Sequence, residues 1–310
     1  MYAGTGAGDL WMPGANRQNQ HSARCPPMSH PATPLLIAET ADRLRAAQAA
    51  GQPRWTDSFD LGRSWEEVVL DTAGWYWRGR SLPWPGKLRP RTIYHFDGAD
   101  FVPVARFSDR LIKLVPTEWQ VPTFEIDGIK MLPTKDASPL EDARRKVALV
   151  APAGRQVLDC CGGLGYFAAM ALEAGAARIV SFEKDPDVLW LRTLNPWSPD
   201  PAASAERLDL LAGDVAAAIG ALADASFDVV LHDPPRFGIA GELYALAFYR
   251  ELARVLRPSG RLFHYTGRPN RLGSGRDLPH EVARRLEQAG LQARPALDGV
   301  FATRRQGRGR

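Results

Sequence analysis

A set of acidic residues, each near the end of an apolar stretch, is the feature of this chain most suited to chemistry. The set comprises Asp159, Glu183, Asp214 and Asp233. Asp159 is followed by a glycine-rich turn at residues 162–165 (GGLG), where the backbone can pass close to a ligand. In an open α/β sheet, an acid at the place of Glu183 accepts hydrogen bonds from ribose hydroxyls, and an acid such as Asp214 suits the adenine amino group. The pattern predicts a site for an adenosine-containing ligand.

These acids require strands that alternate with helices. Apolar runs typical of strands lie at residues 157–158, 178–183, 208–211, 227–232 and 260–265. Helices are expected from about Phe167 and at residues 139–150, 186–194, 215–223, 241–256 and 278–289. The carboxyl ends of the strands in an open α/β sheet border one crevice, where ligands bind. We therefore expect an α/β fold with the acids gathered at that crevice.

This order of motifs resembles the class I S-adenosylmethionine-dependent methyltransferases over roughly Leu140 to Thr303. The resemblance implies a Rossmann-like sheet of seven mostly parallel strands and S-adenosyl-L-methionine as the cofactor. It assigns cofactor binding to Asp159, Gly163, Gly165, Glu183 and Asp214. We also expect Tyr166, which follows the glycine turn, and Asp233 to bind the cofactor. The family's turn reads D-x-G-x-G-x-G, whereas Cys161 stands here at the first glycine. The turn of a nicotinamide dinucleotide site (G-x-G-x-x-G) and the phosphate loop of an ATP site both fit these residues less well.

The residues after the fourth and fifth expected strands are the candidates for catalysis. Residues 233–235 (DPP) offer a carboxylate and rigid backbone carbonyls, because proline has no N–H donor. They resemble the D/N-P-P-aromatic motif of amino-group methyltransferases, with Arg236 in place of the aromatic residue. A histidine side chain has an unperturbed pKa near neutrality, so His264 could accept a proton. We expect Asp233, His264 and Tyr265 to be catalytic, and the alternative for His264 is a structural role in the core.

Residues 227–262 also resemble the spermidine synthases, which transfer an aminopropyl group on the same fold. Those enzymes hold a polycationic amine with acids in the glycine turn and in the loop after the fourth strand. Leu164 and Arg236 occupy these places here, and a cation beside a polyamine is repulsive. We therefore expect methyl transfer to a nitrogen or other polar nucleophile. The alternatives are aminopropyl transfer from decarboxylated S-adenosylmethionine and a non-catalytic nucleic-acid-binding module.

Two further comparisons of motifs narrow the resemblance. The segments IDGIKM, LDCCGGLGY, HDPPR and FHYTG, in this order, are most similar to uncharacterised predicted methyltransferases with a spermidine-synthase-like catalytic domain. A D-P-P-R run is also similar to uridine C5 methyltransferases, which need a cysteine nucleophile after the fifth strand. No cysteine follows Cys161, so covalent C5 chemistry with that nucleophile is excluded.

The first half of the chain has a different pattern. Residues 1–34 are rich in Gly, Pro, Ser, Asn and Gln, which predicts a disordered tail. Residues 35–135 read as a helix at 35–50 followed by short alternating segments, which predict a small antiparallel β-rich domain. Its hairpin turns are expected at Asp97-Gly98 and Asp127-Gly128. Residues 136–310 are expected to form the catalytic domain.

Many aromatic side chains fall in the β-rich domain, notably in the run Trp75-Tyr76-Trp77. A small β core needs large side chains, so packing is the first interpretation of this run. The alternative hypothesis is that the run, or residues 124–131, faces the substrate beside the cofactor.

Composition limits the environment and the partners. The chain has 310 residues and a net charge of +4, and no apolar run is long enough to span a membrane. The first residues lack a secretory pattern, and three cysteines provide neither a disulfide framework nor a zinc motif, so we expect a cytoplasmic protein without a metal site. Arginines at positions 304, 305, 308 and 310 fit either phosphate contacts or a solvated tail. The substrate is therefore left as a small molecule or RNA, with a homodimer among the assemblies left open.

Overall fold

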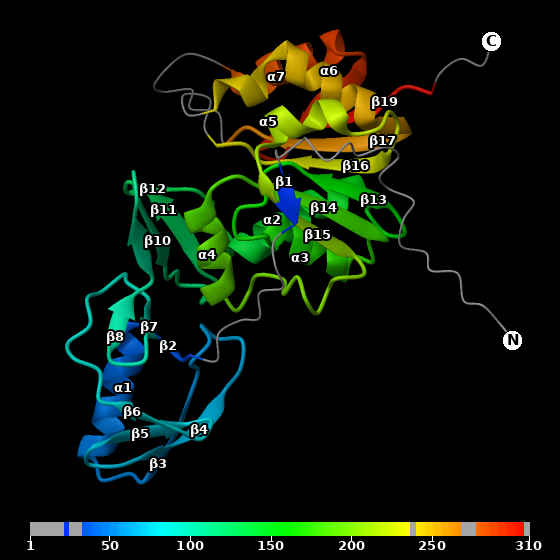
Figure 1. The fold of residues 1–310 in the computed structure, drawn as a ribbon. Coiled ribbons are helices and arrows are strands. Elements are labelled where there is room, and N and C mark those ends of the chain that lie inside the picture. The colour runs from blue at the N-terminus through cyan, green and yellow to red at the C-terminus, as the bar shows by residue number, and fades with distance from the viewer. Residues whose placement is uncertain (1–21, 25–32, 236–239, 268–276, 307–310) are drawn as a thin grey trace, which may run out of the picture.

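In a computed structural model of the chain, the described residues are 22–24, 33–235, 240–267 and 277–306. They form one large sheet with helices on both faces and three small antiparallel sheets (Figure 1). Arg236, Arg308 and Arg310, which some of the expectations concern, lie outside the described residues.

The large sheet has the strand order β1-β15-β14-β13-β16-β17-β19-β18. Its strands are β1 Ser22–Arg24, β13 Gln156–Asp159, β14 Arg178–Glu183, β15 Leu208–Gly213, β16 Phe227–His232, β17 Leu256–Tyr265, β18 Leu291–Ala296 and β19 Gly299–Arg304. Five neighbouring strands pair in parallel, in the spatial order β15, β14, β13, β16 and β17. By contrast, β19 is antiparallel to both of its neighbours. The strands β13 to β19 thus confirm the expected mostly parallel sheet of an α/β fold.

The strand β1 corrects one expectation about the N-terminal tail. It pairs antiparallel with β15, from Ser22 opposite Gly213 to Arg24 opposite Leu211. An edge strand has unpaired backbone groups, and a short added strand satisfies them. Residues 22–24 therefore form an eighth strand of the sheet, whereas the rest of the expected tail, at 1–21 and 25–32, lies outside the described residues.

Two layers of helices cover the large sheet (Figure 1). One layer consists of α2 Pro139–Val150, α3 Tyr166–Glu173 and α4 Pro186–Leu194, and the other of α5 Val215–Ala218, α6 Leu246–Val255 and α7 Leu278–Gln288. Successive residues of a strand point to opposite layers, so Val157 packs with the first layer and Leu158 with the second. Strands buried on both faces read as continuous apolar runs, which is why they stand out in the sequence.

Capping residues explain where two of the helices begin. The Ser138 hydroxyl accepts a hydrogen bond from the Glu141 backbone N–H at 3.0 Å, and proline follows at the first helical position of α2. Asp185 caps α4 in the same way, again before a proline. Both helices have the expected bounds. The runs expected at 215–223 and 241–256 are each divided, into α5 and η1 (Ile219–Ala221) and into η2 (Gly241–Tyr244) and α6.

The N-terminal part contains α1 (Ala38–Ala49) and three small sheets. Their strands are β2 Leu35–Leu36, β3 Arg54–Asp57, β4 Glu66–Leu70, β5 Gly74–Trp77, β6 Arg80–Pro83, β7 Tyr94–Phe96, β8 Phe101–Pro103, β9 Ala105–Phe107, β10 Leu111–Val115, β11 Thr123–Ile126 and β12 Ile129–Lys130. The expected helix begins later than predicted, because β2 pairs with β7 instead. The turns at Asp97-Gly98 and Asp127-Gly128 connect antiparallel neighbours, as predicted.

The aromatic run in β5 packs the core of this N-terminal part. Trp75 and Trp77 are buried together with Leu44 of α1, whereas Tyr76 points to the other face of its strand and is 45% exposed. The alternation follows from the two-residue period of a strand. Packing is therefore the function of the two tryptophans.

None of the helices in the described residues has the length and apolar character needed to cross a bilayer.

Replacing Trp75 with alanine should lower the free energy of unfolding by about 3–5 kcal/mol, because the cavity left in the small core would stay partly empty. Tyr76→Ala, on the exposed face of the same strand, should cost roughly 1 kcal/mol or less. Urea unfolding of both variants measures the difference. Similar losses for the two would contradict the assignment of Trp75 to the core.

Candidate active site

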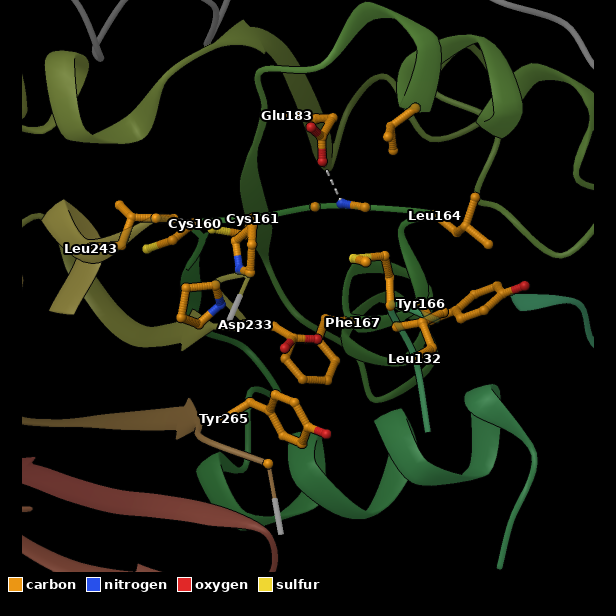
Figure 2. Close-up of a pocket in the computed structure, with 18 of the residues that line it drawn as sticks. Leu132, Cys160, Cys161, Leu164, Tyr166, Phe167, Glu183, Asp233, Leu243 and Tyr265 are labelled. Atoms are coloured by element: carbon orange, nitrogen blue, oxygen red, sulfur yellow. Dashed lines mark hydrogen bonds between the residues drawn. The ribbon is translucent and has the colours of Figure 1, made fainter. Parts of the chain in front are cut away.

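A cavity of about 980 Å³ opens at the carboxyl ends of the parallel strands. Its lining includes the turn after β13, the ends of β14, β15 and β17, the segment after β16, and part of residues 124–135. Ligands of open α/β sheets bind at this edge, and cavities of this size suit a small molecule or cofactor. Figure 2 shows Glu183, Asp233 and Tyr265 around this space.

Most of the residues expected at the site line the cavity. Those that do are Gly163, Tyr166, Glu183, Asp214, Asp233 and Tyr265. Asp159, Gly165 and His264 are outside its lining. Of the two aromatic or apolar segments considered as a substrate platform, residues 124–131 contribute Phe124, Ile126, Lys130 and Met131 to the wall.

The glycine turn has a backbone that other residues would adopt only with strain. Gly163 and Gly165 have φ angles of +49° and +83°, and the Gly165 N–H donates to the Gly162 carbonyl at 2.6 Å. The Phe124 ring covers Gly163, since a Cβ placed there would be 3.7 Å from it. Cys161, at the place of the family's first glycine, lines the cavity, and burial raises the pKa of its thiol so that it stays neutral.

Glu183 holds the turn from the end of β14. One carboxylate oxygen accepts from the Gly163 N–H at 2.8 Å, drawn in Figure 2, and the other accepts from the Asp185 N–H at 2.9 Å. Burial raises the pKa of Glu183, while these two N–H groups and the charge of Arg192 act in the opposite direction. Each oxygen retains a lone pair, so the carboxylate can still accept further hydrogen bonds.

Asp159 does not meet the expectation that it contacts a ligand. Its side chain is fully buried beneath the turn, where it accepts a hydrogen bond from the Ser181 hydroxyl at 2.8 Å. Burial raises the pKa of Asp159 to about 6, although Ser181 and the nearby Arg192 favour its charged form. The strand period turns this side chain inward, so Asp159 supports the turn from below. Gly165 likewise acts through the shape of the turn.

The Tyr166 hydroxyl belongs to a buried hydrogen-bond network that the sequence did not reveal. It donates to the Pro122 carbonyl at 2.7 Å and accepts from the Asn195 amide at 3.1 Å. Asn195 also donates to Ser198, whose hydroxyl donates to the Leu164 carbonyl at 2.7 Å. The network ties the glycine turn to the segment after α4 and to the N-terminal part. The only sequence signal was a polar pair, Asn195 and Ser198, within an otherwise irregular stretch.

Asp214 lies at the cavity rim and begins α5. It caps this helix by accepting from the Ala216 N–H at 2.8 Å. Lys184 Nζ lies 3.4 Å from the Asp214 carboxylate and 3.8 Å from that of Glu242. Asp214 is therefore held in place next to Glu183, with its cap using one side of the carboxylate.

At the other end of the cavity, Asp233 lies near a buried lysine. Lys146 of α2 is 1% exposed, forms ion pairs with Asp142 and, at 3.3 Å, with Asp298, and lies 4.1 Å above the Tyr265 ring. Burial, together with the neighbouring acids Asp142 and Asp298, raises the pKa of Asp233 to about 7, against the opposing charge of Lys146. Sequence reasoning missed this cluster, although Asp142 and Lys146 have the four-residue spacing of a helical ion pair.

His264 is wrong as a catalytic residue. It is fully buried in the core, where Nδ1 is 2.7 Å from the Tyr265 carbonyl and Nε2 is 2.8 Å from the Tyr249 hydroxyl. A carbonyl only accepts, so Nδ1 carries the hydrogen and Nε2 accepts from Tyr249. Burial and the neighbouring His232 lower the pKa of His264 well below its usual value. Its position in the core, outside the cavity lining, favours the structural alternative for this histidine.

Comparison with known proteins agrees with this architecture. No family model matches the chain. It is 42% identical over 200 residues to an uncharacterized protein of Methanocaldococcus jannaschii, an alignment that covers 64% of this chain and 68% of the relative. It is 32% identical over 148 residues to polyamine aminopropyltransferase 2 of Streptomyces coelicolor, covering 46% of this chain and 26% of that enzyme. The chain thus spans about a quarter of the length of the Streptomyces protein.

Among solved structures, a spermidine synthase in complex with the transition-state analogue AdoDATO superposes with a TM-score of 0.51 at 18% identity. The alignment covers 66% of this chain and 73% of the synthase. This likeness shows the fold, an α/β sheet of the spermidine synthase and class I methyltransferase type. The similar proteins with a named activity are transferases.

Alanine at Gly165 should destabilise the protein more than alanine at Gly154. Both glycines have positive φ, which costs an alanine about 1–2 kcal/mol. A Cβ at Gly154 meets nothing within 4 Å, whereas one at Gly165 would be 2.6 Å from the Arg192 guanidinium. Overpacking adds about 1–3 kcal/mol. Urea unfolding measures both, and equal losses would mean that the contact with Arg192 does not constrain the turn.

Proposed function

We propose that this chain, which belongs to the same family as the uncharacterized protein of Methanocaldococcus jannaschii, is a transferase. From the residues of its cavity, we infer that it moves an alkyl group from an S-adenosyl sulfonium donor to an amine nitrogen. The observation that carries the proposal is the arrangement of carboxylates in one cavity. Glu183 and Asp214 lie on one side of the glycine turn and Asp233 on the other. Such a site offers acceptors for an adenosine at one end and a base at the other.

The residues of the turn fit the adenosine part of such a donor. The Glu183 carboxylate, fixed by two backbone N–H groups, has lone pairs left for the two ribose hydroxyls. Asp214 has an oxygen for the adenine amino group. Gly163, without a side chain, lets the ligand approach the backbone, and the Tyr166 ring lies beside it in the lining. The roles of Glu183, Asp214 and Gly163 are the ones that the resemblance implied, whereas Asp159 and Gly165 lie outside the cavity lining.

Asp233 suits the role of the base. Alkyl transfer forms a bond between the amine nitrogen and the carbon attached to sulfur, while the carbon–sulfur bond breaks and its electron pair stays on sulfur. The amine must lose a proton in the course of this exchange. A carboxylate whose pKa is raised to about 7 can take that proton near neutral pH, and the described residues provide it with no side-chain hydrogen bond that would compete.

Aminopropyl transfer has the stronger support of the two forms of this reaction. The Streptomyces relative is named as a polyamine aminopropyltransferase. The acids that the sequence appeared to lack also have counterparts in space. Among the described residues that act on the pKa of Asp233, the acids Asp142 and Asp298 outnumber the cation of Lys146. The excess of negative charge favours a cationic amine as the acceptor.

Methyl transfer is the second candidate, and Leu164 is the observation that favours it. This residue lines the cavity within the glycine turn, where the spermidine synthases are expected to have an acid. A leucine does not repel the carboxylate of S-adenosylmethionine.

Calorimetric titration with S-adenosylmethionine and with its decarboxylated form separates the two candidates. Turnover of the donor that binds is then measured with a panel of amines. Binding of neither donor would refute the transferase proposal.

Glu183→Gln should weaken binding of the preferred donor by about tenfold or more, since hydrogen bonds to a charged acceptor contribute about 1.5–3 kcal/mol. Glu173→Gln is the matched control, because Glu173 is exposed on α3 and pairs with Arg144. Isothermal titration calorimetry measures both dissociation constants. Unchanged affinity in the Glu183 variant would remove the ribose role.

Asp233→Asn should lower kcat/KM by about 10²–10⁴, the usual contribution of a general base. In the wild type, the rate should rise as the pH increases through about 7, because the raised pKa of Asp233 leaves the base protonated below that value. The variant should lose this inflection while its rate still rises at higher pH as the free amine deprotonates. A pH profile with the same inflection in both proteins would rule out Asp233 as the base.

A further inference from the structure

Arg192 lies buried beneath the glycine turn, a place where a cation has no role in the proposed transfer itself. It comes from the last turn of α4 and is 2% exposed. Its guanidinium lies against Gly162 and Gly165 of the turn, with the Ser181 hydroxyl beside it at Gly162. Its charge acts on Asp159, which accepts a hydrogen bond from Ser181. Burying a guanidinium is costly unless charged and polar partners surround it, so its location calls for a specific reason.

The guanidinium determines which residues the turn can contain. A Cβ at Gly162 would be 2.9 Å from Arg192 Nη1 and 2.6 Å from the Ser181 hydroxyl. A Cβ at Gly165 would be 2.6 Å from Nη2 and 2.8 Å from Cζ. The planar group therefore packs against two of the glycines in the turn. Their lack of side chains is explained by Arg192 below as well as by any ligand above.

The charge of the same cation acts on two acids of different exposure. Asp159 is fully buried below the turn, and Glu183 faces the cavity at its edge. The charge of Arg192 favours the ionised form of both carboxyl groups, against their burial. The other charged or titratable groups that act on Glu183 or are acted on by it are Asp159, Asp185 and Cys161. Arg192 is thus the cation among them that offsets the burial of Glu183.

We propose that Arg192 is a positioning residue for the donor: its guanidinium packs against Gly162 and Gly165 and fixes the glycine turn, whose Gly163 N–H holds the Glu183 carboxylate at the cavity. This role rests on the proposed function for its ligand, but not for its effect on the turn. Without Arg192, Glu183 is protonated at a higher pH. A protonated carboxyl has lost one acceptor, so the donor binds less well where Glu183 is neutral.

The test compares Arg192→Met, which removes the charge at similar length, with Arg192→Lys, which keeps a charge without the planar fork. The probe is 5′-methylthioadenosine, which contains the adenosine and thioether common to both candidate donors. Calorimetric titrations at several pH values should show a loss of about tenfold or more for Arg192→Met, greatest at the lowest pH. Arg192→Lys should recover part of the affinity. Arg207→Met, an exposed arginine bonded only to the Leu172 carbonyl among the described residues, is the control and should bind as the wild type does.

A second measurement needs no ligand. Carbon-13 NMR of glutamate carboxyl groups, with Glu183 assigned from the Glu183→Gln variant, should show Glu183 titrating at higher pH in Arg192→Met. If that variant does not fold, Arg192→Gln removes the same charge and takes its place in both measurements. An unchanged affinity of Arg192→Met for the probe, together with an unchanged Glu183 titration, would overturn the role of Arg192. Failure of the wild type to bind the probe would refute the transferase proposal instead, and the NMR titration would still decide the role of Arg192.

Discussion

The double burial of β13 is the constraint on which the cavity depends. Helices α2, α3 and α4 cover one face of this strand and α5, α6 and α7 the other, so Val157 and Leu158 are both inaccessible to solvent. Because both faces are covered, the chain reaches the cavity only at the carboxyl end of β13. Its neighbours β14 and β16 lie on opposite sides, and their connecting segments diverge from that point. The crevice between them is therefore a consequence of topology, and the glycine turn lies at its base.

Acidic side chains at such strand ends are partly or wholly withdrawn from water, and the structure offsets this with cations from one helical layer. Arg192 of α4 lies near Asp159 and Glu183, and Lys146 of α2 lies near Asp233. In both places burial is the largest influence and raises the pKa of the acid, while the buried cation opposes it. The two ends of the cavity differ in the outcome. Glu183 also has two backbone N–H donors, whereas Asp233 has neighbouring acids that raise its pKa further.

Sequence reasoning predicted best the elements whose local and tertiary signals agree. The strands at 178–183 and 227–232 are apolar because both faces are buried, and α2 and α4 have a polar cap followed by proline, so their bounds matched. It failed where tertiary pairing decides. Leu35 and Leu36 fit a helical pattern but form β2 with β7, and Ser22–Arg24 fit a disordered tail but pair with β15.

In the candidate site, too, local sequence signals were predictive, whereas features that depend on tertiary packing were not. The residues at strand ends could be listed from the sequence, but the direction of each side chain could not. Asp159 and His264 both occupy the ends of strands and point into the core rather than the cavity. Lys146 and Arg192 looked like ordinary helix residues, because a buried cation is recognised only by the acids that surround it in space. The side chains of a strand always alternate between its two faces, but the packing on either side decides which of them point into the core.

The choice between the two transfer reactions depends on the residues away from the adenosine. Both candidate donors share the part that Glu183 and Asp214 would hold, so these acids cannot discriminate between them. Discrimination must come from Leu164 in the turn, which tolerates a carboxylate, and from the Asp142, Asp233 and Asp298 group, which attracts a cation. The first acts on the donor and the second on the acceptor, so they do not contradict each other. An acid-rich acceptor end is compatible with either group transferred, provided that the nucleophile is an amine whose remaining positive charge the acids can balance.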